Sequence, residues 1–396
     1  MSENAIVIVA GARTATGSFG GQLAAVPNHE LGAHAVAAAA QRAGLPVSAV
    51  DEFVIGCVGQ IGGDAFVARR AALAAGARPD SGALAVNRLC GSGLQAVATA
   101  ADGLRLGHYQ LAVAGGCENM SRQPFLDFQA RDGWRLGHHT LVDGTQSLVT
   151  DPWGDYPMGM TAEQVAARFD ISRQAQDEFA AESQRRAQEA LAAGAVAAEI
   201  APLTVRDRQG DRVVDHDEHP RAGVTAEKLS RMRPAFKAGG SVTAGNSSGI
   251  NDAAAALVMT TSRVAAERGL PVLGELVGFA TAGVEPEIMG YAPRYAIAKV
   301  LAQTGLALSD IGWTELNEAF AAQAVAVIRD TGLDTETTNP LGGAIAWGHP
   351  IGATGAILTL RTLLNLNQRG LEHGLVAMCI GGGQGVAAVF RAGNQT

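Results

Sequence analysis

The residue best suited to covalent chemistry in this sequence is Cys90, in the stretch Asn87-Arg88-Leu89-Cys90-Gly91-Ser92-Gly93. Residues 82–86 predict a short buried strand, and apolar residues at helical spacing follow from Leu94. Cys90 is therefore expected in a turn from strand to helix, where free N–H groups and the helix dipole favour a thiolate. The alternative is an inert core cysteine. A nucleophile here needs a base and an oxyanion site from elsewhere.

Three further positions have the chemistry to supply those functions. His349 stands between Gly348 and Pro350, in a turn that lets backbone approach a ligand. Cys379 ends an apolar run and is followed by three glycines, residues 381–383, whose bare N–H groups suit an oxyanion. Asn317 precedes an acidic residue at an expected helix start. Each has an ordinary alternative: a structural histidine, a core cysteine or a helix cap. Their coincidence in one chain favours a catalytic site.

The elements that must position these residues alternate between strand and helix at both ends of the chain. This pattern predicts mostly parallel sheets covered on both faces. Near the N-terminus we expect strands at 6–9, 52–56, 82–86 and 111–116, with helices at 31–43 and 66–75. Near the C-terminus we expect strands at 273–279 and 375–380, with helices at 292–303, from 315 to 328 and after residue 355.

The two ends also repeat one order of features. In each, a Gly-rich turn with one reactive residue starts a helix, and a strand that ends in glycine follows. We interpret this as a diverged duplication of one α/β unit. Cys90 and His349 would then lie at equivalent helix starts, which a pseudo-twofold arrangement of two sheets brings together.

Residues 119–250 differ in composition from the first part of the chain, because they carry Trp, Tyr, Pro and charged residues that the first part lacks. We expect an inserted, partly helical region between an N-terminal half, 1–118, and a C-terminal half, 251–396. Residues 206–221 are charged and predict irregular structure. The small, polar segment 242–249 offers N–H groups and hydroxyls to a ligand, and a helix is expected after it at 252–259.

Composition limits the function classes. The chain of 396 residues predicts about two or three domain-sized units, and its net charge of −8 gives no basic surface for nucleic acid. Four cysteines without metal-ligand spacing predict free thiols in a reducing compartment. Residues 1–4 lead into a strand without a basic leader, and no apolar run reaches membrane-span length. We expect a soluble, cytoplasmic protein without a metal site.

The four motifs together resemble those of the thiolases, a family of acetyl-CoA C-acetyltransferases and 3-ketoacyl-CoA thiolases. The motifs are 87–93, Asn317-Glu318-Ala319-Phe320, Gly348-His349-Pro350-Ile351-Gly352 and Cys379-Ile380-Gly381-Gly382-Gly383. The resemblance covers essentially the full length. It implies two βαβαβαββ halves in a five-layered αβαβα core, with a long loop domain inserted from the first half.

The resemblance also implies roles for these residues. Cys90 is the acylated nucleophile and His349 takes its proton, while Cys379 exchanges a proton with the α-carbon of acetyl-CoA. The N–H groups of Cys90 and Gly381 face the thioester oxygen of the acylated cysteine. His349 and a water held by Asn317 face the enolate oxygen. A thiol base of this kind requires a lowered pKa, which a helix terminus and a nearby imidazole can provide.

Coenzyme A is implied as a substrate, with no bound cofactor. Ser248 matches the family serine at the pantetheine, and Arg221 and Phe236 fall where the family contacts the nucleotide and the pantetheine arm. For Arg221 the alternative is a solvated charge. Ala319 and Met158 are also assigned to substrate binding, and in the family the methionine narrows the acyl pocket.

One position departs from the short-chain biosynthetic members, which carry His-Met-Gly where this chain has Pro157-Met158-Gly159. Loss of a polar side chain makes that wall more apolar and resembles the degradative 3-ketoacyl-CoA thiolases. We therefore expect broad or medium-chain 3-ketoacyl-CoA substrates and a role in β-oxidation. The alternative is an acetoacetyl-CoA thiolase restricted to short chains.

Two rival functions share this scaffold. Condensing enzymes of the ketoacyl synthase type pair the cysteine with two histidines, or with histidine and asparagine, so Cys379 favours a thiolase. An inactive acyl-CoA or lipid-binding protein would be expected to lack Cys90, His349 or Cys379. Thiolases of this kind assemble as tetramers, with a dimer as the minimum. Exposed aromatic residues within 120–145 are the expected tetramer contact, and ordinary loop packing is the alternative.

Overall fold

The computed structural model describes residues 4–207 and 210–393, so residues 1–3, on which part of the N-terminal expectation rests, lie outside it. The first half alternates strand and helix and ends in two consecutive strands. Its elements are β1 (Ile6–Arg13), α1 (Asn28–Arg42), β3 (Glu52–Gly56), α2 (Val67–Ala74), β4 (Gly82–Val86), α3 (Ser92–Arg105), β5 (Ala112–Asn119) and, after the insertion, β12 (Asn251–Thr261). A short strand, β2 (Gly17–Ser18), pairs with β12.

The second half repeats this order after α8 (Ser262–Arg268). Its elements are β13 (Gly274–Gly283), α9 (Pro293–Thr304), β14 (Ile311–Leu316), α10 (Ala321–Thr331), α11 (Ala344–Trp347), α12 (Thr354–Arg369), β15 (His373–Ile380) and β16 (Gln384–Ala392). The counterpart of β4 is reduced to a parallel bridge between Thr338 and Thr314. Both halves share one strand order, β4-β3-β5-β12-β1 and Thr338-β14-β15-β16-β13. The expected duplication is therefore confirmed in the topology.

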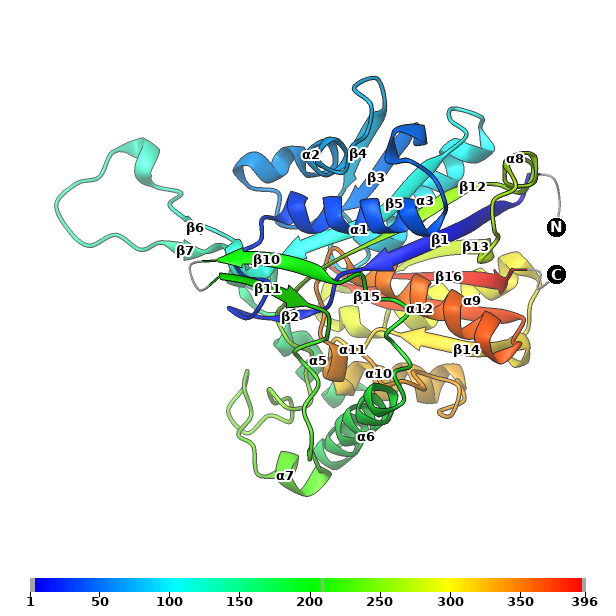
Figure 1. Ribbon diagram of the computed structural model, residues 1–396. Helices are drawn as coiled ribbons and strands as arrows, with labels where there is room; N and C mark the ends of the chain where they lie inside the picture. Colours follow the sequence, from blue (N-terminus) through cyan, green and yellow to red (C-terminus); the bar gives the residue numbers. More distant parts are fainter. Residues whose placement is uncertain (1–3, 208–209, 394–396) are drawn as a thin grey trace.

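The helices and half-sheets form the expected five layers (Figure 1). Helices α1 and α2 cover the outer face of the first half-sheet, and α9 and α10 cover that of the second. Helices α3 and α12 lie between the half-sheets, and their apolar side chains share one core cluster with residues of both. The half-sheets meet edge to edge through two residue pairs, Val7 with Glu275 and Ile8 with Gly274.

The helix expected at 252–259 is wrong, because this segment is the strand β12. It pairs antiparallel with β1 on one side and β5 on the other. Its alanine run suits a helix by propensity, but burial on both faces of a central strand overrides that preference. The small side chains also allow close approach, since a Cβ on Gly115 of β5 would lie 2.2 Å from the carbonyl oxygen of Ala255. We propose that the second half begins after β12 rather than at residue 251.

Three further expectations need correction. The large sheet is not mostly parallel: among its described strands only β3 with β4 and β5, and β14 with β15, pair parallel, whereas β12 and β16 pair antiparallel with the strands on both sides of them. The segment that starts at Glu315 continues strand β14 to Leu316, and the helix begins only at Ala321. Asn317 is therefore not a helix cap but lies in the turn between them. Strand β4 is not buried, because it is the edge strand of its sheet, and the Leu84 side chain is 47% exposed.

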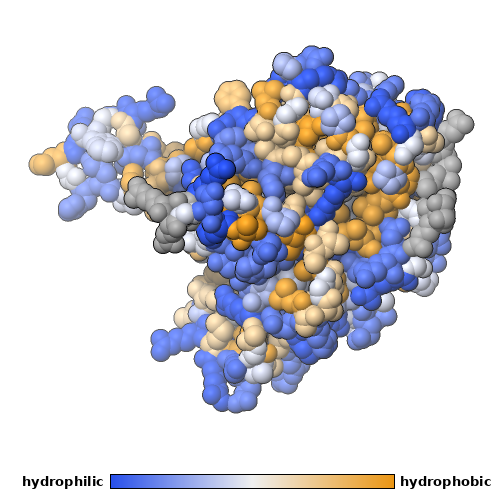
Figure 2. Space-filling model, in the orientation of Figure 1, coloured by the Kyte–Doolittle hydropathy of each residue, from blue (hydrophilic) through white to orange (hydrophobic). Residues whose placement is uncertain are grey.

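The insertion combines helices with small hairpins. Its elements are β6 (Phe125–Leu126), β7 (Val142–Asp143), α4 (Gly144–Leu148), β8 (Thr150–Asp151), β9 (Tyr156–Pro157), α5 (Gly159–Arg168), α6 (Arg173–Ala192), β10 (Leu203–Asp207), β11 (Gly210–Val214) and α7 (Ala226–Ser230). The charged stretch expected to be irregular thus begins in the β10–β11 hairpin. Residues 125–143, which we call the arm, project away from the body (Figure 1). Figure 2 shows apolar residues on this projection, where Phe125, Phe128 and Trp134 are exposed.

A buried ion cluster ties the insertion to both halves. Glu199 of the insertion accepts hydrogen bonds from Arg13 of β1, at 2.6 Å, and from Arg361 of α12, at 2.9 and 3.0 Å. Asp217 accepts two more from Arg13, at 2.7 and 2.9 Å. All four side chains have almost no exposed surface. Their charges compensate one another in a position where an unpaired charge is strongly destabilising.

Candidate active site

Cys90 lies in a tight turn immediately before α3, as expected. Leu89 holds a left-handed conformation, with φ of 46°, which turns the chain sharply at the cysteine. The Ser92 hydroxyl donates to the carbonyl oxygen of Leu89 at 2.6 Å and accepts the N–H of Arg88 at 2.9 Å. Asn87 accepts the N–H of Leu89 at 2.9 Å. These local bonds stabilise the turn that presents the thiol.

The turns of Cys90 and His349 meet because α3 and α12 touch at their N-terminal ends. A Cβ on Gly93 would lie 2.8 Å from the backbone nitrogen of Ala356, and a Cβ on Gly355 would lie 2.4 Å from that of Leu94. Only glycine on both helices permits this approach. The duplicated topology therefore brings the two reactive turns to one place.

Buried Glu118 ties the loop that follows β3 to the loop that carries His349. It accepts the N–H groups of Val58 at 2.9 Å and Gly59 at 3.0 Å, from the first half. It also accepts the N–H of Gly352, at 3.0 Å, from the loop that carries His349. Burial raises the pKa of Glu118 to about 7, although these three donors oppose the shift.

His349 is 5% exposed and held at three points. Its N–H donates to Asn251 Oδ1 at 3.0 Å, its Nδ1 lies 2.7 Å from Thr354 Oγ1, and its Nε2 lies 3.4 Å from Asn317 Nδ2. Burial lowers the pKa of His349 to about 4. At neutral pH the ring is therefore uncharged and able to accept a proton.

Asn317 and Cys379 come from neighbouring parallel strands, β14 and β15. The N–H of Asn317 donates to the carbonyl oxygen of Ala377 at 2.9 Å, which continues the ladder beyond the end of β14. Asn317 Oδ1 is buried without a protein partner, a position suited to a bound water. Beyond Cys379 the chain turns through Gly382 and Gly383, at φ of 81° and 79°. That conformation favours glycine.

The expected lowering of the pKa values of the two thiols, Cys90 and Cys379, is wrong. Burial raises the pKa of Cys90 to about 11, although the N–H groups of Gly381 and of Cys90 itself are directed at the sulfur and oppose this. Burial also raises the pKa of Cys379, and the nearby Cys90 adds to the effect. A partly enclosed, apolar position outweighs the helix terminus, so both thiols are protonated at neutral pH.

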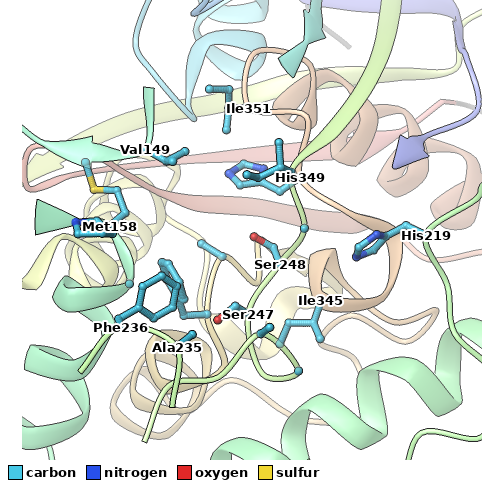
Figure 3. Close-up of a pocket in the computed structure, with 18 of the residues that line it drawn as sticks. Val149, Met158, His219, Ala235, Phe236, Ser247, Ser248, Ile345, His349 and Ile351 are labelled. Atoms are coloured by element: carbon cyan, nitrogen blue, oxygen red, sulfur yellow. The ribbon is translucent and has the colours of Figure 1, made fainter. Parts of the chain in front are cut away.

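These residues face one cavity of about 650 Å³. All the expected site residues except Asn317 line it, namely Cys90, Pro157, Met158, Arg221, Phe236, Ser248, Ala319, His349, Cys379 and Gly381. Asn317 does not line the cavity, but its side chain lies 3.4 Å from the His349 ring. In Figure 3, His349 and Ser248 lie near the centre of the view, with Met158 and Phe236 on one side and His219 on the other. A cavity of this size accommodates an extended thioester arm.

The loop that carries Ser248 is fixed against the turn of Asn317. The N–H of Ser248 donates to the carbonyl oxygen of Ala319 at 3.0 Å, and the N–H of Ala321 donates to that of Asn246 at 2.9 Å. Phe236 packs edge-on against Phe320, with ring centroids 6.2 Å apart. Ser248, Ala319 and Phe236 thus form one continuous wall of the cavity.

Arg221 lies at the exposed end of the cavity wall. Its N–H donates to Gln184 of α6 at 2.9 Å, and its charge, after burial, contributes to lowering the pKa of neighbouring His219 to about 4. Lys228 also lines the cavity, and its ammonium donates to the carbonyl oxygen of Gly223 at 2.7 Å. The positive charges of Arg221 and Lys228 suit the binding of a negatively charged part of a ligand at this end of the cavity.

Several residues at this site were not assigned to it from the sequence. Thr354 and Asn251 contact His349, but their side-chain partners depend on the packing of α12 and β12 against distant loops. Apolar residues around the cysteine, Met120, Leu148, Val149 and Ile351, line the cavity from the insertion and the histidine loop. The sequence offered one clue to two of these residues, which is their position in the chain. Met120 directly follows β5, and Ile351 lies two residues after His349.

Two family models match the chain, the thiolase N-terminal domain over residues 6–263 and the thiolase C-terminal domain over residues 270–392. The beta-ketothiolase BktB of Cupriavidus necator is 48% identical over 387 residues, which cover 97% of this chain and 98% of that protein. The acetyl-CoA acetyltransferase of Rhizobium meliloti is 46% identical over 98% of both chains.

Solved structures agree with these matches. The acetyl-CoA acetyltransferase of Bacillus anthracis superposes with a TM-score of 0.97 at 42% identity, over 98% of this chain and 99% of that one. Human mitochondrial 3-ketoacyl-CoA thiolase in complex with CoA has a TM-score of 0.95 at 36% identity, over 98% of both chains. With the fold, the sequence and the cavity in agreement, this chain belongs to the thiolase family of acyltransferases.

Proposed function

We propose that this thiolase cleaves 3-ketoacyl-CoA to acetyl-CoA and a shortened acyl-CoA, and runs the reverse Claisen condensation, through an acyl group carried on Cys90. The observation that carries the proposal is the convergence of two thiols and a neutral imidazole on one cavity, with the N–H groups of Gly381 and Cys90 at the nucleophilic sulfur.

In the first half-reaction Cys90 attacks the 3-keto carbon while His349 takes the thiol proton. Because the pKa of Cys90 is raised to about 11 and that of His349 lowered to about 4, no stable ion pair forms in advance. The proton therefore moves as the sulfur–carbon bond forms. The bond between C2 and C3 then breaks and leaves the acyl group on Cys90. Cys379 protonates C2 of the departing acetyl-CoA enolate.

Two sets of donors stabilise the developing negative charges. The N–H groups of Cys90 and Gly381 receive the oxygen of the acyl-cysteine, and protonated His349 with a water on Asn317 receives the enolate oxygen. In the second half-reaction the thiol of coenzyme A gives its proton to the Cys379 thiolate and attacks the acyl-cysteine. Acyl-CoA is released, and protonated His349 returns its proton to the Cys90 sulfur.

The long wall of the cavity suits coenzyme A. Ser248 and Phe236 border the path of the pantetheine, and Arg221 at the exposed end faces the phosphates of the nucleotide. Ala319 and Met158 contact the thioester end. Coenzyme A acts as a substrate, and the reaction as written needs no metal or resident cofactor.

The acyl side of the cavity is apolar, which supports activity beyond the four-carbon ester. Pro157 lies on the exposed rim beside Met158, where it offers no polar group. Leu148, Val149 and Ile351 add apolar surface near Cys90. We propose a degradative enzyme of broad or medium chain length that serves β-oxidation. The alternative, a thiolase restricted to acetoacetyl-CoA, keeps the same mechanism.

We propose a homotetramer as the assembly, with the arm as the contact between dimers. Phe125, Phe128 and Trp134 of the arm are 65%, 75% and 63% exposed, and several exposed apolar side chains on one projecting segment are typical of an interaction site. In the described part of the chain, no helix combines the length and apolar character that a membrane span needs. A cytoplasmic location is proposed on the cysteine usage.

Thiolysis across a ladder of 3-ketoacyl-CoA esters, from acetoacetyl to long-chain, tests the proposal, with Cys90→Ala as the control. Activity strongest beyond the four-carbon ester and absent in the variant supports it. Activity confined to acetoacetyl-CoA would keep the mechanism and overturn the chain-length proposal. Failure to cleave any ester would overturn the whole proposal.

A further inference from the structure

One of the contacts to the ring of His349 comes from a hydroxyl group that the reaction does not itself use. Thr354, the first residue of α12, is 3% exposed, and its Oγ1 lies 2.7 Å from His349 Nδ1. The same oxygen donates to the carbonyl oxygen of Pro350 at 2.9 Å. The hydroxyl proton is thus directed away from the ring, and a lone pair of Oγ1 faces Nδ1.

A neutral imidazole carries one N–H and one lone pair, so its two nitrogens have different roles. If His349 takes the proton of Cys90, the accepting nitrogen must be unprotonated. Nδ1 is enclosed by Thr354, so Nε2 is the nitrogen left to act. The amide nitrogen of Asn317 lies 3.4 Å from Nε2, and because an amide nitrogen only donates, this contact fits an unprotonated Nε2.

We propose that Thr354 is a positioning residue that accepts the Nδ1–H of His349 and thereby keeps the lone pair of Nε2 available for the thiol proton of Cys90. The inference rests on the proposed role of His349 as the base. The hydroxyl accepts the same hydrogen bond before and after proton transfer, because Nδ1–H is present in both the neutral and the charged ring. The ring therefore need not rotate between half-reactions.

A Thr354→Val variant keeps the shape of the side chain and removes the acceptor. Nδ1–H is then buried without a partner, which favours the tautomer with the proton on Nε2. Thr354→Ser restores the hydroxyl. Thr359→Val is a matched control, because Thr359 is also buried in α12 and donates to the carbonyl oxygen four residues earlier, Gly355, at 2.8 Å. This hydrogen bond of Thr359 does not involve His349.

We expect Thr354→Val to lower kcat for thiolysis by about 10- to 100-fold, as for other residues that orient a functional histidine, with KM for coenzyme A unchanged. Thr354→Ser should recover most of the loss, and Thr359→Val should retain the kcat of the unmodified enzyme. Unchanged kcat in Thr354→Val, or an equal loss in Thr359→Val, would overturn the inference.

The tautomer itself is measured by ¹⁵N NMR of histidine-labelled protein, with His349 assigned by its absence in His349→Asn. The unmodified enzyme should show Nδ1 protonated and Nε2 unprotonated. The opposite tautomer would overturn the inference even if Thr354→Val does not fold. This spectrum needs no turnover, so it separates a wrong role for Thr354 from a failure of the proposed reaction, which the ester ladder reports.

Discussion

A buried thiol with a raised pKa holds its proton until a base or a rise in pH removes it, and Cys90 is such a thiol. Because its pKa is raised to about 11, the thiolate fraction should grow about tenfold with each pH unit from 7 to 10. The rate of Cys90 alkylation by iodoacetamide, followed by mass spectrometry in a Cys379→Ala background, should rise accordingly. A rate that is already constant at pH 7 would instead indicate a preformed thiolate–imidazolium pair.

The rim of the acyl cavity offers a second residue-level prediction. Pro157→His places a polar ring beside the path of the acyl chain, so kcat/KM for longer esters should fall about five- to tenfold relative to acetoacetyl-CoA. The same ester ladder measures the ratio. Pro152→His is the matched control, because Pro152 is exposed near β8 but does not line the cavity. An unchanged ratio in Pro157→His would remove Pro157 from the determinants of chain length.

At the scale of single residues, the sequence indicated those with reactive groups, because the glycines around Cys90, His349 and Cys379 mark turns that a ligand can approach. It did not indicate Thr354 or Asn251, which act through hydrogen bonds formed only after distant elements pack. The direction of the thiol pKa shifts was also predicted wrongly. A helix terminus is visible in a sequence, whereas the depth of burial that outweighs it is not.

Among the elements, the ion cluster joins the insertion to β1 and α12. Glu199→Gln removes the charge shared by Arg13 and Arg361, which leaves buried cations undercompensated. The free energy of unfolding should therefore fall by about 3–5 kcal/mol, measured by urea denaturation. Glu267→Gln, in an exposed pair with Arg263 of α8, should change it by less than about 1 kcal/mol. Equal effects of the two substitutions would contradict a structural role for the cluster.

Strand β14 carries a buried carboxyl group whose ionisation opposes folding. Glu315 accepts the indole N–H of Trp313 at 2.9 Å, its second oxygen has no partner, and burial raises its pKa to about 8. The folded chain therefore holds a proton that the unfolded chain, with a pKa near 4.5, releases. This group lowers stability as pH rises between those values, by about 1.4 kcal/mol per unit.

Glu315→Gln should reduce the fall in the free energy of unfolding between pH 4.5 and about pH 8, since glutamine cannot ionise. Urea midpoints at a series of pH values from 5 to 9 in both proteins provide the measurement. Equal slopes in the two profiles would show that the carboxyl group is already compensated in the folded state.

The alternation of elements could be predicted because apolar periodicity and glycine stops are local signals. Helices α1, α2, α9 and α12 and strands β1, β3 and β15 lie close to their expected ranges. Strand β12 could not be predicted, since its alanines favour a helix and only its position between β1 and β5 makes it a strand. The start of α10 was misplaced for a related reason, because Glu315 is a buried strand residue despite its charge.

For the whole molecule, the arm is the feature that predicts assembly. Replacement of residues 127–140 by a short Gly-Ser linker removes Phe128 and Trp134 while the base of the hairpin remains. We expect a tetramer to become a dimer, as measured by light scattering after size-exclusion chromatography, because the exposed apolar surface of the arm is lost. An unchanged mass would show that the arm is not the contact between dimers.

The position of β12 has a consequence for how the chain is made. Its neighbours in the sheet, β5 and β1, leave the ribosome long before it, and the whole insertion is synthesised between Asn119 and Asn251. During that interval both neighbours have an unpaired edge, of the kind that invites misassembly with other chains. A nascent chain stalled before residue 251 should therefore be a good chaperone client, and one released after residue 261 a poorer one. The insertion thus sets the earliest moment at which the first half can close.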